Sequence, residues 1–174
     1  MKKILLLVGI IIIVSVFYIY YPRTINLDAQ GLKYRLGAGS IGNEQLINLH
    51  INGKMYKSIT GNKTFKGIIE FEDDGFPVPK EHRQLEINFQ RTNVGIIKYH
   101  YNQDDKPVTF MFGSIYISKD FSKVTIAVLD HEEDSVSWTG EDGIMITSPA
   151  SNRSEAIDIS NELMKGTLDG HKLK

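Results

Sequence analysis

Apolar and polar residues alternate along most of this chain, and this alternation constrains the fold more than any other feature of the sequence. The clearest case is the run "LEINFQ", residues 85–90, in which leucine, isoleucine and phenylalanine alternate with glutamate, asparagine and glutamine. A period of two residues places all the apolar side chains on one face of an extended strand. The run therefore predicts a strand with one face in a core and one face in solvent.

Seven other runs have a similar composition, and short turns rich in acidic residues separate several of them. Eight consecutive strands with short connections predict an antiparallel meander, which buries its apolar face by closing into a barrel or splitting into a sandwich. Within the first pair of runs, Asn52-Gly53 is the strongest short-range hairpin signal, and it predicts a turn there. The eight predicted strands cover residues 46–51, 54–59, 64–72, 85–90, 94–101, 108–118, 123–130 and 143–147.

One helix is predicted after the strands, over residues 149–166. Its apolar residues recur every three or four positions, Ser151 or Asn152 is placed to cap its start, and Gly166 is placed to end it. We expect this amphipathic helix to pack on the sheet or to plug one end of a barrel, with residues 167–174 as a frayed tail. The predicted fold class is mainly β (α+β), with an N-terminal transmembrane helix, about eight meandering strands and this C-terminal helix.

The N-terminal transmembrane helix is predicted from residues 4–21, a run of 18 residues without a charge. As a helix, this run is about 27 Å long, close to the thickness of the hydrocarbon core of a bilayer. A cleaved secretory signal is the alternative, but the run ends in tyrosines, and the nearest small residue for a cleavage site is Ala29. The sequence favours an uncleaved, single-pass anchor that contacts the lipid bilayer through residues 4–21.

The charges around this run predict its orientation. Two lysines lie within residues 1–3, so this segment is expected in the cytoplasm and the rest of the chain outside. Residues 22–42 are then a juxtamembrane stalk, and residues 43–166 are an extracytoplasmic β domain that includes the helix. The absence of cysteine and the abundance of lysine, isoleucine and asparagine favour the cell envelope of a Gram-positive bacterium.

Charge and composition exclude several classes of function. Without Lys2 and Lys3, 18 basic residues remain against 21 acidic ones, so the outer part is acidic and nucleic acid is not expected as a partner. A chain without cysteine has no thiol nucleophile and no thiolate metal site. Three of the five histidines fall on or near different strands without a His-x-x-x-His pair, so no metal site is predicted.

The run "GAGSIG", residues 37–42, has the G-x-G-x-x-G spacing of a dinucleotide-binding loop. Such a loop must lead into a helix and be followed about twenty residues later by an acidic residue, whereas a strand follows here and no acid lies near residue 62. The turn of a hydrolase nucleophile around Ser40 requires the same helix. We therefore predict no nucleotide, no cofactor and no catalytic residue, and interpret the run as a glycine joint between the stalk and the β domain.

An envelope hydrolase is a remote alternative, because Glu86 can face Glu70 or Glu72 across neighbouring strands. The polar, solvent-facing positions of these carboxylates argue against it, and we predict that the protein is not an enzyme. Exposed aromatic residues are a more useful sign of recognition. Tyr99 and Tyr101 share one face of a strand, and Trp138 lies in the polar run "SVSWTG". We predict these three aromatic residues as partner contacts.

Two functions remain open. The favoured one is a non-catalytic, membrane-anchored accessory or interaction domain that binds another envelope protein. The alternative is a lipocalin-like β-barrel that binds a small apolar ligand. A ligand-binding barrel requires a cavity of about 300 Å³ or more. We expect the face of Phe65, Phe71, Ile87 and Phe89 to line that cavity in a carrier and to be packed solid in an interaction domain.

Overall fold

Strands dominate the structure, as the alternation in the sequence predicts. The structure is a computed structural model that describes residues 10, 20–40, 42–71, 76–90, 92–132 and 135–174. Ten strands and one regular helix lie in this part of the chain, with two short 3₁₀ turns at Ala38–Ser40 and Lys80–His82. The elements are β1 (Arg23–Arg35), β2 (Gln45–Lys57), β3 (Lys63–Phe71), β4 (Gln84–Phe89), β5 (Val94–Gln103), β6 (Lys106–Ile117), β7 (Val124–Val128), β8 (Asp130–Glu132), β9 (Ser135–Ser137), β10 (Ile144–Ser148) and α2 (Arg153–Leu163).

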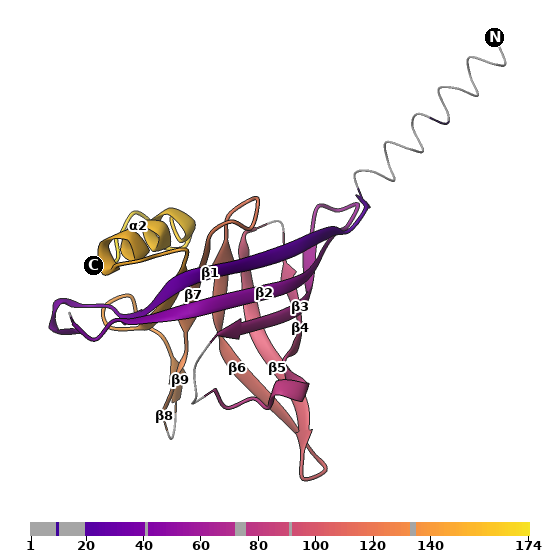
Figure 1. The fold of residues 1–174 in the computed structure, drawn as a ribbon, viewed down its shortest axis with the longest axis horizontal. Helices are drawn as coiled ribbons and strands as arrows, with labels where there is room; N and C mark the ends of the chain where they lie inside the picture. Colours follow the sequence, from indigo (N-terminus) through magenta and orange to yellow (C-terminus); the bar gives the residue numbers. More distant parts are fainter. Residues whose placement is uncertain (1–9, 11–19, 41, 72–75, 91, 133–134) are drawn as a thin grey trace.

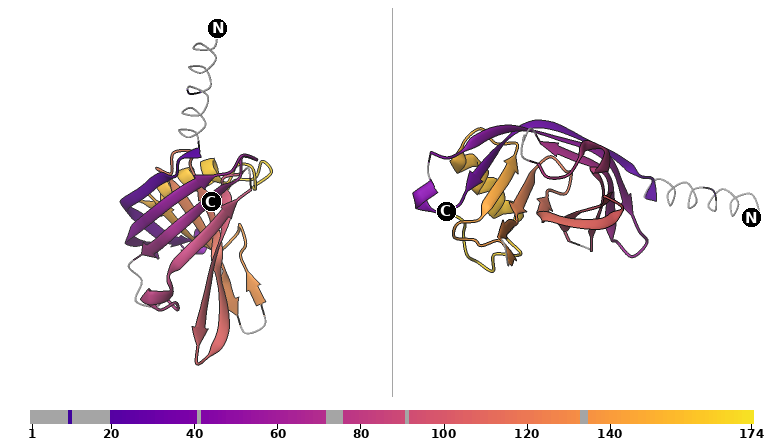
Figure 2. Two further views of the ribbon diagram at one scale, coloured as in Figure 1. Left: turned by 90° about the vertical axis from the view of Figure 1, so that its right-hand side faces the viewer. Right: turned by 90° about the horizontal axis from the view of Figure 1, so that it is seen from below.

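Eight of these strands form one antiparallel sheet in the order β4-β3-β2-β1-β10-β7-β6-β5 (Figures 1 and 2). The sheet curls until its edge strands, β4 and β5, lie side by side. At this seam Gly95 lies against Ile87 and Phe89, and a Cβ atom at position 95 would be 3.0 Å from the Phe89 ring. The prediction of a mainly β fold with one C-terminal helix is confirmed, and the sheet is a nearly closed barrel. The short strands β8 and β9 pair separately.

The barrel has a core inside and a second core outside. The inner core takes the alternate apolar residues of the strands, such as Ile87 and Phe89 of β4. The outer core lies where α2 covers β1, β7 and β10, so that β7 and β10 are buried on both faces (Figure 1). Asn152 caps α2, because its side chain accepts a hydrogen bond from the backbone N–H of Glu155 at 3.0 Å. The predicted helix therefore packs on the outside of the barrel and does not plug its end.

The hairpin turn predicted at Asn52-Gly53 is wrong. Strand β2 continues through both residues to Lys57, and the chain turns at Ser58–Asn62. Gly53 of β2 is directly opposite Gly67 of β3. A Cβ atom at position 67 would lie 2.6 Å from the Cα atom of Gly53 and 2.8 Å from the Phe65 ring, so the two glycines allow this close approach. Tertiary packing therefore overrides the local preference of Asn-Gly for a turn.

Residues 22–42, predicted as a stalk, contribute β1, which pairs with both β2 and β10. The glycine run 37–42 connects β1 to β2, with positive φ angles of 87° at Gly37 and 95° at Gly42. It is therefore a loop within the barrel domain, and the strand that follows it is β2. The C-terminal tail is held rather than frayed, because the side chain of Asn161 bonds both the N–H and the C=O of the buried Leu173, at 2.8 and 3.2 Å.

The transmembrane prediction falls mainly on residues 1–9 and 11–19, which lie outside the described residues. Within the described residues, none of the helices has the length and apolar character needed to span a bilayer.

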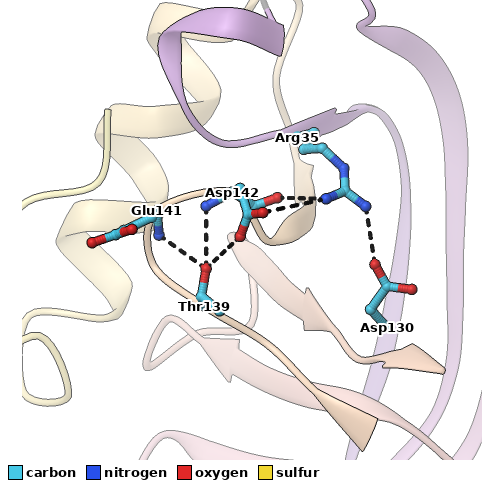
Figure 3. A network of polar contacts seen from close by, with 5 residues as sticks. All are labelled: Arg35, Asp130, Thr139, Glu141 and Asp142. Carbon is cyan, nitrogen blue, oxygen red and sulfur yellow. Dashed lines mark hydrogen bonds and ion pairs between the residues drawn. The ribbon is translucent and has the colours of Figure 1, made fainter. Parts of the chain in front are cut away.

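We call the end of the barrel where β1 begins the proximal end, and the opposite end the distal end. The proximal end carries the β2–β3 turn and the β6–β7 loop, and the distal end carries the β1–β2 and β5–β6 connections (Figure 1). At the distal end, Arg35 bonds the carboxylate of Asp130 at 3.0 Å and the carbonyl of Asp142 at 3.1 Å (Figure 3). The Thr139 hydroxyl accepts from the backbone N–H of Glu141 and of Asp142. This network ties β1 to the loop before β10.

Candidate functional site

A pocket of about 340 Å³ opens at the proximal end of the barrel. It lies where the first half of β1 extends beyond β10 and where the β6–β7 loop crosses towards β2 and β3. Its volume is at the small end of the range for sites that bind small molecules. The lining residues are Tyr21, Arg23, Ile25, Met55, Lys57, Lys63, Ile117, Lys119, Asp120 and Phe121.

The floor of the pocket is apolar and is continuous with the inner core. Ile25, Met55, Ile117 and Phe121 form it, and all four belong to the inner core or pack against it. Phe121 is only 5% exposed, and its ring stacks on Phe65 with the centroids 5.7 Å apart. An apolar group in the pocket would therefore contact the inner core at the proximal end of the barrel.

The β6–β7 loop holds Phe121 in an unfavourable backbone conformation. Its φ angle is 65°, in the left-handed region, which costs a bulky residue on the order of 1 kcal/mol. Asp120 stabilises the loop, because its carboxylate accepts from the hydroxyls of Ser118 and Ser122 at 2.6 and 2.8 Å. These hydrogen bonds, first that from Ser118, hold the pKa of Asp120 well below its usual range, so the carboxylate stays ionised. Strain of this kind is typical of ligand-binding sites.

The rim of the pocket is positively charged. It carries Arg23, Lys57, Lys63 and Lys119, against the single carboxylate of Asp120. Lys57 and Lys63 are directly opposite each other across β2 and β3, a like-charge pair that destabilises a sheet. In the part of the chain that the structure describes, none of the four rim cations is within 4.0 Å of a carboxylate oxygen. Arginines elsewhere do have such partners: Arg35 with Asp130, Arg83 with Glu70 and Arg153 with Glu44.

An apolar floor below a cationic rim fits an amphiphilic anion. If each non-hydrogen atom takes about the 30 Å³ that a water molecule occupies in the liquid, the pocket holds about 11 such atoms. That number corresponds to a single hydrocarbon chain of moderate length. A carboxylate or phosphate at one end of the chain would then reach the cations of the rim.

The predicted partner contacts are dispersed over the structure. Tyr99 is fully buried in the inner core, where any contact it makes is with a group inside the barrel. Tyr101 is half-buried at the distal end and stacks on His82, with ring centroids 5.5 Å apart. Trp138 is half-buried beside the outer core, against Gly143. Binding of a partner through these residues stays a prediction.

The face proposed to line a cavity is instead part of the packed inner core. Phe65, Phe71, Ile87 and Phe89 are all buried, and the Phe71 ring stacks on Phe112 with the centroids 5.1 Å apart. The pocket of about 340 Å³ lies at the end of this face and is lined by other residues. A packed face is the arrangement expected of an interaction domain and not of a carrier with a cavity at the centre of the barrel.

The carboxylate pair of the hydrolase alternative is not assembled by the described residues. Glu86 is opposite Lys66 and forms an ion pair with it at 2.8 Å, while Glu70 lies 4.0 Å from Arg83. Glu72 lies outside the described residues. Among the residues that are described, no group of three His, Asp or Glu side chains is arranged to hold a metal ion.

Two buried tyrosines differ in the partners of their hydroxyls. The Tyr34 hydroxyl lies between the sheet and α2, 2.9 Å from Ser160 Oγ, which is also 2.8 Å from Thr147 Oγ1 and 3.1 Å from Thr125 Oγ1. The Tyr99 hydroxyl lies in the inner core, and none of the described residues forms a hydrogen bond with it. Burial raises the pKa of both tyrosines, and for Tyr99 the nearby Glu70 raises it further while Arg83 lowers it.

The same substitution is therefore expected to have opposite effects at these two positions. Tyr34→Phe should lower the free energy of unfolding by about 1 kcal/mol, because it removes a satisfied buried hydrogen bond. Tyr99→Phe should raise it by about 1 kcal/mol, because it removes a buried hydroxyl that has lost its water without gaining a partner. Urea unfolding of the full chain in neutral detergent, followed by the fluorescence of the single tryptophan, measures both values. Equal losses for the two variants would contradict the assignment.

The tyrosines also predict how stability depends on pH. Their raised pKa means that the folded state keeps phenolic protons which the unfolded chain releases near pH 10. These two groups therefore leave the free energy of unfolding unchanged below about pH 10 and lower it as the pH rises further. Tyr99→Phe removes one of the two groups, so its unfolding free energy is expected to fall less steeply above pH 10 than that of the unmodified chain.

Comparison of the chain with protein-family models, with curated proteins and with solved structures finds no match. The functional interpretation therefore rests on the residues of the pocket. Sequence reasoning missed this pocket because its rim residues are far apart along the chain. One local signal was available: Lys57 and Lys63 flank the turn "SITGN", so that two lysines meet at one end of a hairpin.

Proposed function

We propose that this protein is a non-catalytic binding domain that takes up an amphiphilic anion at the proximal end of its barrel. The observation that carries the proposal is the pocket whose apolar floor continues the inner core and whose rim has four cations that form no ion pair with any described carboxylate. This proposal modifies the lipocalin-like alternative in two respects. The ligand carries a negative charge, and it enters at the mouth of the barrel rather than occupying its centre.

The proposed location follows from the sequence. Residues 4–21 are the proposed single-pass anchor, with the barrel outside the cytoplasmic membrane of a Gram-positive cell. Strand β1 begins at Arg23, two residues after the end of this run. The pocket would therefore lie beside the outer surface of the bilayer, where single-chain amphiphiles concentrate.

A photoreactive fatty acid tests the proposal. The full chain in neutral detergent micelles is irradiated with a 10-carbon carboxylic acid that carries a diazirine near its methyl end, and cross-linked residues are identified by mass spectrometry of peptides. We expect cross-links at the pocket floor, on Ile25, Met55, Ile117 or Phe121. Cross-links within residues 4–20 report the micelle alone and do not count as binding, whereas Tyr21 also lines the pocket.

The matched probe is the alcohol of the same chain length. It lacks the charge, so its cross-links at the pocket floor are expected to be at least about tenfold weaker at equal concentration. Equal labelling of the floor by both probes would show a purely apolar site and contradict the anionic part of the proposal. Labelling confined to residues 4–20 would contradict the whole proposal.

A second candidate is binding of another envelope protein at the distal end, the interaction function favoured by the sequence. It is supported by the β5–β6 hairpin, which projects from the distal end (Figure 1) and carries Tyr101 stacked on His82. A photoreactive amino acid in place of Tyr101 would cross-link such a partner in cells. The same amino acid in place of Lys119, at the proximal end, serves as the control.

A further inference from the structure

The turn between β2 and β3 presents an isoleucine to solvent at the proximal end. Ile59 is 88% exposed, more than any other large apolar side chain that the structure describes. The turn itself is ordered: Ser58 N–H donates to the carbonyl of Asn62 at 2.8 Å, and the Ser58 hydroxyl accepts from Asn62 N–H at 3.1 Å. A compact turn therefore holds Ile59 outward. Its apolar side chain stays in contact with water, which is unfavourable for the isolated domain.

Two tyrosines and two lysines lie at the same end of the barrel as this isoleucine. Lys57 and Lys63 flank the turn, and Tyr56 and Tyr21 are exposed at the same end of the barrel. An exposed apolar tip flanked by lysines, with exposed tyrosines close behind, combines the kinds of side chain found where a protein meets a bilayer. The apolar group enters the acyl region, tyrosine lies among the headgroups, and lysine contacts phosphate.

The position of the proposed anchor, residues 4–21, determines that this surface faces the bilayer. Arg23, the first residue of β1, is paired with Met55 near the end of β2, so the β2–β3 turn lies at the same end as the start of β1. Tyr21 ends the proposed anchor and is two residues from Arg23, a distance of at most about 7 Å. The inference rests on the proposed anchor of residues 4–21 and does not require a ligand in the pocket.

We propose that the proximal end docks onto an anionic lipid bilayer, with Ile59 inserted below the headgroups and the rim cations in contact with lipid phosphates. The partner is a bilayer rather than a protein because the tether holds this surface within a few ångströms of the lipid, and because its charge is opposite to that of the lipid. Arg23, Lys57, Lys63 and Lys119 outnumber Asp120 on the rim, although the chain as a whole has a net charge of −1. Docking directs the mouth of the pocket at the bilayer, so a ligand can enter from the lipid without crossing water.

The absence of cysteine allows a direct test. The full chain with Ile59→Cys is labelled with a nitrobenzoxadiazole fluorophore and reconstituted into vesicles of phosphatidylcholine, with or without an equal amount of phosphatidylglycerol. Lipids that carry a nitroxide on the acyl chain quench a fluorophore only when it enters the bilayer. We expect blue-shifted, quenched emission in the anionic vesicles, with the ratio of docked to undocked protein raised about fivefold for each cation that contacts lipid.

The matched control is Gln103→Cys, which carries the same label on the β5–β6 hairpin at the distal end and is expected to stay unquenched in both vesicles. An unquenched label at position 59 in anionic vesicles would overturn the inference, and so would equal quenching at positions 59 and 103. These outcomes are separate from the proposed function, because cross-linking of the pocket floor is measured in neutral micelles. Loss of docking with intact cross-linking refutes the docking alone.

Discussion

A Lys57→Glu variant is expected to bind the photoreactive fatty acid about 30-fold more weakly while its fold becomes slightly more stable. The substitution changes the charge of the pocket rim by two units, at about 1 kcal/mol for each charge near an anionic group. It also replaces the like-charge pair with Lys63 by an attractive pair across β2 and β3, worth about 0.5 kcal/mol. Cross-linking yield against probe concentration measures binding, and urea unfolding measures stability.

Opposite signs for binding and stability separate a role in the pocket from a general loss of structure. The control is Lys106→Glu, which makes the same change of charge on the first residue of β6, at the distal end. We expect this control to leave cross-linking of the pocket floor unchanged. If both variants weaken binding of the fatty acid equally, the effect is one of net charge. Unchanged binding in Lys57→Glu would refute the role of the rim.

A Gly67→Ala variant is expected to lose about 3 kcal/mol of unfolding free energy, the upper part of the range for overpacking. The added Cβ atom would collide with the carbonyl oxygen of Asn52 and lie 2.6 Å from the Cα atom of Gly53, so β2 and β3 would have to separate. The midpoint of thermal unfolding should fall by about 6–12 °C for a domain of this size. Calorimetry of the full chain in neutral detergent measures the shift.

The control for this prediction is Gly166→Ala, just after α2. A Cβ atom at position 166 has no heavy atom within 4 Å, and the backbone there has no positive φ angle. This variant is expected to be neutral or to stabilise the fold by about 0.5 kcal/mol, because alanine reduces the freedom of the unfolded chain. A Gly67→Ala variant as stable as Gly166→Ala would show that the two strands do not approach as closely as the structure has them.

The strands and the helix were largely predictable from the sequence, because each depends on residues close together in the chain. The alternation in residues 85–90 reappears as β4, with Leu85 and Ile87 buried and Glu86 exposed. The cap at Asn152 was also readable, since it joins residues only three positions apart. The turn assigned to Asn52-Gly53 failed because Gly53 meets Gly67 across the sheet, a contact that no short window of sequence contains.

The place of residues 22–42 and the pocket were not predictable in the same way. Strand β1 is recognised as part of the barrel only through its pairing with β2 on one side and with β10, more than 100 residues later, on the other. The pocket depends on this pairing, because its lining extends from Tyr21 to Phe121 along the chain. The role of Ser160 in α2 was missed for a related reason. Its hydroxyl is within hydrogen-bond distance of Tyr34 and of two threonines of the sheet, which are all distant from it in the sequence.

The sequence by itself indicated most of the strands that follow residue 42, which face of each is apolar, where the helix begins, and that an uncharged run precedes the first strand. These properties follow from backbone geometry and from side-chain periodicity within a few residues. Only the tertiary structure decided that the sheet curls into a nearly closed barrel and that α2 covers its outer face. It also decided that the rim cations gather at the end where β1 begins, with no carboxylate of the described residues within ion-pair distance. The reason is physical: the order of strands and the charge at each end depend on contacts between residues that are distant in sequence. Local periodicity does not indicate which distant residues come into contact.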